Sequence, residues 1–466
     1  MEWREDPGGY QLWFRLRVVK WKEMTFMREF LPAEIDASCN AVHLSEFDER
    51  VIDDYVSWRT APIFPRRGRM AWHILERPTG CSSGQVYEAA KIKGVGVFDP
   101  EDETRGRDPI TSGTFSSATP PTTQPLTSFM TYPHLGFRPD GRFAVVHGAA
   151  APVGGITLSK ARREFDAAHA LLNAGVPAIA PLRVYRYPDL VFRGESMGVA
   201  VSAAPDRLPW RLSEAQQGVA LHPGKNSSRD LYYHRLLEAF GIIGDPSAED
   251  TRVRLICALA RQVGERIRQY SMAGLFRYSA EFSNFEFDFR HRRVVLTDLD
   301  SAEFIETASI ETRRLEVMRD FASGMYHLAA KFAAPTALGR FSVPMLLKHD
   351  PLAHYASGYF GVAEPNRWQT LTFRLWNAFL PHFNLINTVG AVRGDKWGQA
   401  ERRSYKMDHH LFFILVFCEF AESFTRYGDS LPGYAPDPDR LILNAESFLG
   451  FRFGYLSHLR SIRVAL

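Results

Sequence analysis

The chain has 466 residues, of which 45% are hydrophobic, 13% aromatic and 23% charged. These proportions are typical of folded proteins and exclude a disordered or fibrous chain, and at roughly 100 to 200 residues per domain the length predicts two to four domains or lobes. The net charge is only +3, which argues against a nucleic-acid partner and against a membrane-surface partner.

The cysteines and the apolar runs indicate where the protein functions. Four cysteines lie far apart without a Cys-x-x-Cys pair, which favours buried thiols in a reducing compartment. Met1–Asp6 contains acidic residues where a secretory signal needs a basic start. The longest apolar run, Leu411–Cys418, is shorter than the ~20 residues that cross a bilayer, so it predicts a buried helix or strand. We therefore expect a soluble, cytoplasmic protein with no membrane partner.

The first part of the chain divides into an extension and a strand-rich lobe. Residues 1–75 show no pattern that indicates a chemistry, and we interpret them as an N-terminal extension. The lobe is predicted over residues 76–210 and includes a strand at Val86–Phe98 that two glycines interrupt. Residues 101–137 form an insertion, in which Thr111–Ser128 consists mostly of Ser, Thr, Pro and Gly and predicts a mobile loop.

The rest of this lobe alternates between strand and helix patterns. A strand is predicted at Phe143–Val146, followed by a helix with Ser159 as a candidate N-cap and a stop at Gly175. Pro181–Tyr187 and Met197–Ser202 then predict two further strands. The pattern predicts a lobe of strands with one inserted helix.

The second half of the chain is predominantly helical. Residues 211–305 are predicted to form the core of a C-terminal lobe, with helical periodicity over 230–273. Phe285–Thr297 predicts a β-hairpin whose basic tip, Arg290–Arg293, is interpreted as solvated rather than as a nucleic-acid patch. Residues 306–466 are predicted to form a helical C-terminal region.

One acidic residue lies where an apolar one is expected. Glu164 falls on the same helical face as Ala161 and Ala168. Burying a carboxylate without a partner costs several kcal/mol, so either the helix edge lets Glu164 reach water or a cation meets it. The candidate cation is Lys93 on the preceding strand.

Asn284 and Asp298 flank the predicted hairpin. A strand Lys, a helix Glu, an Asn, a hairpin and an Asp, in this order, are typical of protein-kinase-like folds, in which the Asn and the Asp hold Mg²⁺. We therefore predict an α+β, bilobal, kinase-like protein with a strand-rich N-lobe, a helical C-lobe and additional C-terminal helices. Five residues before Asn284, where a kinase has its catalytic Asp, the chain has Ser279.

Four short segments resemble, in the same order, the selenoprotein O (SelO) family: Ile92–Gly96, Asp140–Val145, Arg163–Phe165 and Ala174–Ala178. The resemblance covers roughly residues 86–305. It implies a kinase-like fold with the nucleotide in an inverted orientation, and transfer of AMP from ATP onto protein hydroxyls.

The resemblance also implies roles for individual residues, namely nucleotide contacts at Lys93, Gly94 and Gly96, an ion pair from Glu164 to Lys93, and Mg²⁺ or Mn²⁺ ligation by Asn284 and Asp298. For the arginine that contacts phosphate in the family, the spacing leaves Arg207 and Arg211 as alternatives, of which we prefer Arg211. The sequence departs from the family at Ser283, where the family has its proposed general base, and in the insertion at residues 101–137.

Three functions remain open from the sequence. The leading hypothesis is an Mg²⁺-ATP-dependent transferase that moves AMP onto a hydroxyl of a protein, peptide or small molecule. The first alternative is a kinase that transfers the γ-phosphate to a protein or a small molecule. The second alternative is a catalytically inactive pseudokinase that acts as a partner-binding module.

Overall fold

The structure is a computed structural model, and the part that it describes consists of residues 30–65, 68–81, 84–98, 118, 120–123, 133–137, 143–147, 152–217, 228–276, 280–333, 341–377 and 399–428. Every element reported below lies in the compact unit Leu31–Leu466. The fold belongs to the predicted α+β class, with an antiparallel sheet followed by helices.

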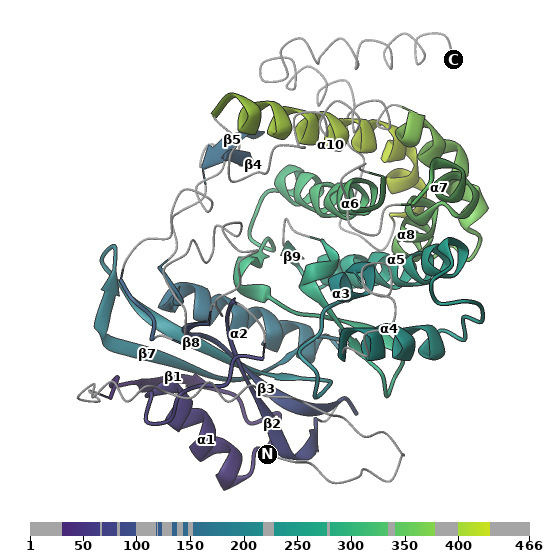
Figure 1. Ribbon diagram of the computed structural model, residues 1–466. Coiled ribbons are helices and arrows are strands. Elements are labelled where there is room, and N and C mark those ends of the chain that lie inside the picture. The colour runs from purple at the N-terminus through teal and green to yellow at the C-terminus, as the bar shows by residue number, and fades with distance from the viewer. Residues whose placement is uncertain are drawn as a thin grey trace. The chain divides into compact units, whose positions relative to one another are not determined.

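The sheet has six strands, namely β1 (Glu34–Ser38), β2 (Gly68–Gly80), β3 (Val86–Phe98), β6 (Ile156–Thr157), β7 (Ala180–Phe192) and β8 (Glu195–Ala204). Five of them follow the order β1-β7-β8-β3-β2, β6 pairs with β8, and every pairing is antiparallel (Figure 1). The first strand of the sheet thus begins at Glu34. The predicted boundary at residue 76, between the N-terminal extension and the strand-rich lobe, falls within β2. The short β1 carries too few residues to show an alternating pattern.

Two helices cover opposite faces of the sheet (Figure 1). Because side chains alternate along a strand, Ala90 and Ile92 of β3 face the core that contains helix α1 (Glu46–Val56). Lys91 and Lys93 face the other side, where helix α2 (Leu158–Asn173) packs against β7 and β8. The same strand therefore supplies apolar residues to one face and cations to the other.

Helix α2 contributes to two hydrophobic cores. Ala161 packs with residues of the sheet such as Val184, whereas Ala167, Ala168 and Leu171 belong to the large core of the helical part. These residues recur at helical spacing and form one stripe. The helix therefore joins the sheet to the helices that follow.

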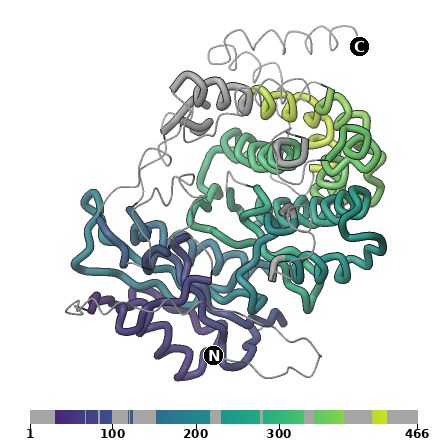
Figure 2. The backbone as a smooth tube through the Cα atoms, viewed as in Figure 1, coloured from purple at the N-terminus to yellow at the C-terminus, as the bar shows by residue number. Residues whose placement is uncertain are grey.

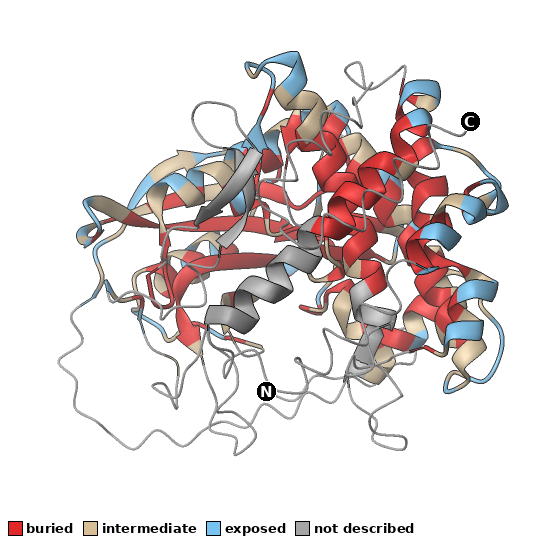
Figure 3. Ribbon diagram, turned by 90° about the horizontal axis from the view of Figure 1, so that it is seen from above, coloured by how far each residue is buried: buried red, intermediate tan, exposed pale blue. Residues whose placement is uncertain are grey.

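The helical part contains α3 (Leu212–Gln217), α4 (Ser228–Ala239), α5 (Glu249–Met272), α6 (Ile310–Ala333), α7 (Val343–His349), α8 (Pro351–Phe360) and α10 (Gln399–Tyr427). Figure 2 follows the chain from the strands, in purple and blue, to these helices, in teal to yellow. Their facing sides are buried (red in Figure 3), including the predicted run Leu411–Cys418 within α10. Among the helices that the structure describes, none is long and apolar enough to cross a membrane.

The predicted hairpin is formed by β10 (Phe285–Asp288) and β11 (Arg293–Leu296). Its tip is exposed, as expected for a solvated turn. Strand β11 also bonds to the segment that leads into β7, because Ile179 N donates to Leu296 O at 2.9 Å and Leu296 N donates to Pro177 O at 3.0 Å. These bonds connect the hairpin to the sheet-forming part of the chain.

Helices α5 and α8 approach each other through glycines. A Cβ atom added at Gly358 would lie 1.8 Å from Arg261 O, and one added at Gly264 would lie 2.2 Å from Tyr355 O. Helix α5 in turn supports the hairpin, since Arg266 Nε donates to Val294 O at 2.9 Å. Helix α5 thus contacts α8 on one side and the hairpin on another.

Gly358→Ala is expected to destabilise the protein by about 3 kcal/mol or more, because the new methyl group meets backbone atoms that cannot rotate away. Urea unfolding measures the loss. Gly241→Ala is the control, since a Cβ there meets nothing within 4 Å and the change costs only the strain of its φ of +62°, roughly 1 kcal/mol. Equal losses in the two variants would contradict the close helix contact.

Candidate functional site

The amine of Lys93 lies among three carboxylates. Lys93 Nζ is 2.7 Å from Glu164 Oε2 and 3.1 Å from Asp300 Oδ2, and it also donates to Asp298 Oδ1. The lysine is only 3% exposed. The cluster thus joins β3, α2 and the segment that follows β11, and it brings together three of the residues expected from the sequence.

The position of Glu164 follows from the stripe of α2. The residue is 1% exposed and lies between the apolar residues of that stripe, so its carboxylate points into the protein. Helix α2 also packs against η3, a 3₁₀ turn at Leu299–Ser301. A buried carboxylate requires a cation, and Lys93 supplies it.

Asp298 has an unusual backbone conformation. Its φ of 61° and ψ of 57° place it in the left-handed region, which Asp tolerates better than most residues. Its side chain is 29% exposed, compared with 10% for Asp300 and 1% for Glu164. Asp298 is therefore the most accessible of the three carboxylates, and its strained backbone is of the kind found at functional sites.

Asn284 and Asp298 lie at the same end of the hairpin. Asn284 closes the 3₁₀ turn η2 (Phe282–Asn284) just before β10, and its carbonyl accepts a 3.1 Å hydrogen bond from Thr297 N. Asn284 is 5% exposed. The predicted pair therefore occupies two adjacent strand ends.

Arg211 spans these strand ends. It is 7% exposed, its Nη1 donates to Ser283 O, and the same atom is 3.4 Å from Asp298 Oδ2. Arg207, the alternative left open by the spacing, is exposed, and its carbonyl accepts from Trp72 Nε1 at 3.0 Å. The structure therefore brings Arg211, and not Arg207, to Asp298.

Neighbouring charges keep Lys93 and Asp300 ionised. Burial lowers the pKa of the Lys93 ammonium, but Asp298, Asp300 and Glu164 outweigh burial and raise this pKa above its usual value. Burial likewise raises the pKa of Asp300, but Lys93 and Arg69 outweigh it and the pKa is lowered. Lys93 and Asp300 are therefore both charged at neutral pH.

A second buried lysine was not predicted. Lys91 is 0% exposed, its Nζ lies 3.3 Å from Glu286 Oε1, and it donates to Thr297 Oγ1. Thr297 Oγ1 donates to Glu286 Oε1 at 2.9 Å. Because Thr297 precedes Asp298, this network fixes the residue next to the cluster. The available signal was the i, i+2 spacing of the two lysines, which places both on one face of β3.

Gly94 and Gly96 have positive φ values of 94° and 146°. A Cβ at Gly94 would lie 2.7 Å from Ile156 Cγ1 and 2.8 Å from Gly198 O. Gly94 is therefore required for the close approach of β3 to β8 and β6. The expected contacts of both glycines with a nucleotide remain predictions.

The three carboxylates suit a hard divalent cation. One ligand oxygen each from Glu164, Asp298 and Asp300 lie within 4.8 Å of one another. Glu164 Oε1 is buried and accepts no hydrogen bond from the residues that the structure describes. Mg²⁺ and Mn²⁺ prefer oxygen ligands of this kind, but the Lys93 ammonium lies among the same three carboxylates. Of the three, only Asp298 is a ligand that the sequence implies.

Some expected features lie outside the described residues. These are Ser279 and most of Thr111–Ser128. Within residues 101–137, Pro133–Phe137 forms strand β4, which pairs with β5 (Phe143–His147). That part of the insertion is therefore a strand rather than a loop.

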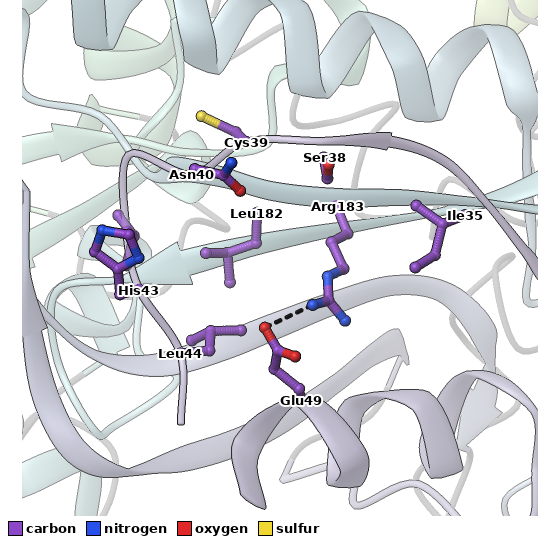
Figure 4. A pocket seen from close by; sticks show the side chains of 10 residues that line it. Ile35, Ser38, Cys39, Asn40, His43, Leu44, Glu49, Leu182 and Arg183 are labelled. Atoms are coloured by element: carbon purple, nitrogen blue, oxygen red, sulfur yellow. Dashed lines mark ion pairs between the residues drawn. The ribbon is translucent and has the colours of Figure 1, made fainter. Parts of the chain in front are cut away.

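A pocket of about 170 Å³ lies elsewhere, beside β1, α1 and β7 (Figure 4). Arg183 points into it and forms a 2.6 Å ion pair with Glu49. None of the residues predicted from the sequence lines this pocket. The candidate site is therefore defined by its charged cluster and not by this cavity.

Comparison with known proteins assigns no family. No family model matches the chain, and no curated protein matches it. Among the solved structures, one described as "WaaP in complex with acyl carrier protein" matches with 15% identity and a TM-score of 0.27, covering 61% of this chain and 95% of that chain. A TM-score of this size does not establish a shared fold.

Lys91→Met is expected to destabilise the protein by about 3–5 kcal/mol, because it leaves the Glu286 carboxylate buried without its cation. The loss is measured by urea unfolding. The double variant Lys91→Met/Glu286→Leu removes the stranded charge and is expected to recover part of the stability. A double variant that is less stable than Lys91→Met would contradict the buried ion pair.

Proposed function

We propose that the chain is an Mg²⁺-ATP-dependent transferase with a site organised like that of a protein kinase. The observation that carries the proposal is the buried ion pair between Lys93 and Glu164, with Asp298 bonded to the same amine. In protein kinases a strand Lys paired with a helix Glu contacts the nucleotide phosphates, and an Asp that follows a hairpin holds Mg²⁺. The chain has these residues in the same order.

Each residue has a role in this proposal. Lys93 contacts phosphate, and Glu164 holds its amine in place. Mg²⁺ or Mn²⁺ is ligated by Asp298 and by Asn284 at the adjacent strand end. When bound, the metal neutralises charge on the phosphates. Arg211 fixes both strand ends and supplies a further cation beside Asp298.

The resemblance to SelO supports AMP transfer as the reaction. In that step an acceptor hydroxyl oxygen bonds to the α-phosphorus of ATP, and the bond to the β-phosphate oxygen breaks. Pyrophosphate leaves with the bonding electrons, and the hydroxyl proton passes to water or to a nearby carboxylate. Ser279, in place of a kinase's catalytic Asp, counts against γ-phosphate transfer, the main alternative.

Ser283 stands where the SelO family has its proposed general base, and this loss does not exclude catalysis. Such a base contributes about 10²- to 10⁴-fold, whereas transfer at phosphorus depends chiefly on positioning and on charge stabilisation by metal and cationic side chains. The acceptor in this proposal is a hydroxyl of a protein, peptide or small molecule.

The deciding experiment uses ATP labelled separately at the α- and γ-phosphates, with Mg²⁺ and then Mn²⁺. Label transfer and intact mass are followed for the wild type and for Asp298→Asn. We expect α-label transfer with an AMP mass increase, and a loss of roughly 100-fold or more in the variant, because a metal ligand is removed. Asp54→Asn is the matched control, since that side chain is 30% exposed and pairs with Arg59 at 3.6 Å.

Each other outcome has a definite meaning. Transfer of the γ-label would assign the protein as a kinase. If neither label moves but Mg²⁺-ATP raises the Tm of the wild type and not of Asp298→Asn, the site binds nucleotide without transferring to the acceptors offered. If neither label moves and ATP does not change the Tm, the proposed function is wrong.

Lys93→Ala is a less informative variant. Lys93 is 3% exposed, and its removal leaves Glu164 and Asp300 buried without their shared cation. We expect this variant to lose stability as well as activity, which a thermal melt measures. An unchanged Tm would contradict the buried ion cluster.

A further inference from the structure

Asp300 is surrounded by cations from three elements. Lys93 Nζ of β3 lies 3.1 Å from Asp300 Oδ2, and Arg69 Nη2 of β2 lies 3.7 Å from the same oxygen. Burial lowers the pKa of Lys160 of α2, and Asp300 opposes this effect. Arg69 is held in place, because its Nη1 donates to Gly155 O at 3.3 Å.

Lys160 occupies an unfavourable place for a cation. It lies one helical turn before Glu164, on the same face of α2, and within the first turn of that helix. The N-terminus of a helix is its positive end and favours anions, yet the first turn of α2 has no acidic residue. Glu195, from β8, lies at this helix end, where its Oε1 accepts from Ser159 N at 2.6 Å.

Among the described residues, cations outnumber carboxylates at the cluster. The carboxylates of Glu164, Asp298 and Asp300 face four cations: Lys93, Arg69, Lys160 and Arg211. Arg163 also acts on Lys160 but pairs with Glu303 at 3.3 Å. Burial lowers the pKa of Lys160 and the neighbouring cations Arg69 and Lys93 lower it further, against the opposing effect of Asp300. An added anion would therefore relieve a local excess of positive charge.

We infer that Arg69 and Lys160, together with Lys93, form a subsite for the polyphosphate group of the bound nucleotide. This inference rests on the proposed function and assigns two residues that the sequence did not single out. Asp300 holds Lys93 and Arg69 near one another before a phosphate arrives. The Asp300 carboxylate then competes with the phosphate for the same cations.

Calorimetric titration with tripolyphosphate in EDTA, and separately with Mg²⁺-ATP, tests the subsite. Arg69→Met and Lys160→Met are each expected to reduce the affinity for both ligands on the order of 10- to 100-fold. This is the usual effect of losing a hydrogen bond to a charged group. Arg69→Lys, which keeps the charge, is expected to restore part of the affinity. Arg162→Met is the matched control on α2, because Arg162 is 55% exposed and pairs with Asp36.

Asp300→Asn gives a result that a structural role would not produce. Removing the competing carboxylate is expected to tighten tripolyphosphate binding in EDTA severalfold, although the variant loses a buried ion pair. Weaker or unchanged binding in Asp300→Asn would contradict the competition, and thermal melts of all variants exclude unfolding as the cause.

The inference and the proposed function fail in different ways. If the wild type binds Mg²⁺-ATP and the Arg69 and Lys160 variants bind it equally well, the subsite is overturned and the proposed function stands. If the wild type binds tripolyphosphate but no ATP, and the Arg69 and Lys160 variants lose tripolyphosphate binding, the subsite stands as an anion site. The proposed function is then wrong. Binding of neither ligand by the wild type overturns both.

Discussion

The ammonium group of Lys93 is the interaction on which the rest of the site depends. Three carboxylates from α2 and from the segment after β11 are close enough to repel one another strongly, and two of them are almost fully buried. The Lys93 ammonium offsets this repulsion because it lies among all three carboxylates. The Lys93 side chain therefore connects the sheet, the helix and the hairpin end at one point.

The parts of the structure that could be predicted from the sequence depend on local patterns. Glu164 was identifiable because a carboxylate interrupted an apolar stripe at helical spacing, and the hairpin because two runs of strand-forming residues flanked a basic turn. Asn284 and Asp298 followed from their places at the ends of that hairpin. In each case the residues that carry the signal lie within a few turns or strands of one another.

The parts that could not be predicted depend on contacts between distant residues. Lys91 and Glu286 are separated by 195 positions, so no local spacing relates them. Arg69 reaches Asp300 only because β2 pairs with β3, and the strands before residue 76 carried no clear alternating pattern. The choice between Arg207 and Arg211 depends on where the chain turns after β8, which spacing alone does not determine.

The stripe of α2 has a consequence for how this chain can vary. Lys160 and Glu164 of the charged cluster, Ala161 of the sheet core and Leu171 of the helical core all share one helical register. Each inserted or deleted residue would rotate everything beyond it by about 100°. Such a change would keep either the charged cluster or the helical core in register, but not both. The number of residues between Lys160 and Leu171 is therefore fixed by two separate sets of contacts at once.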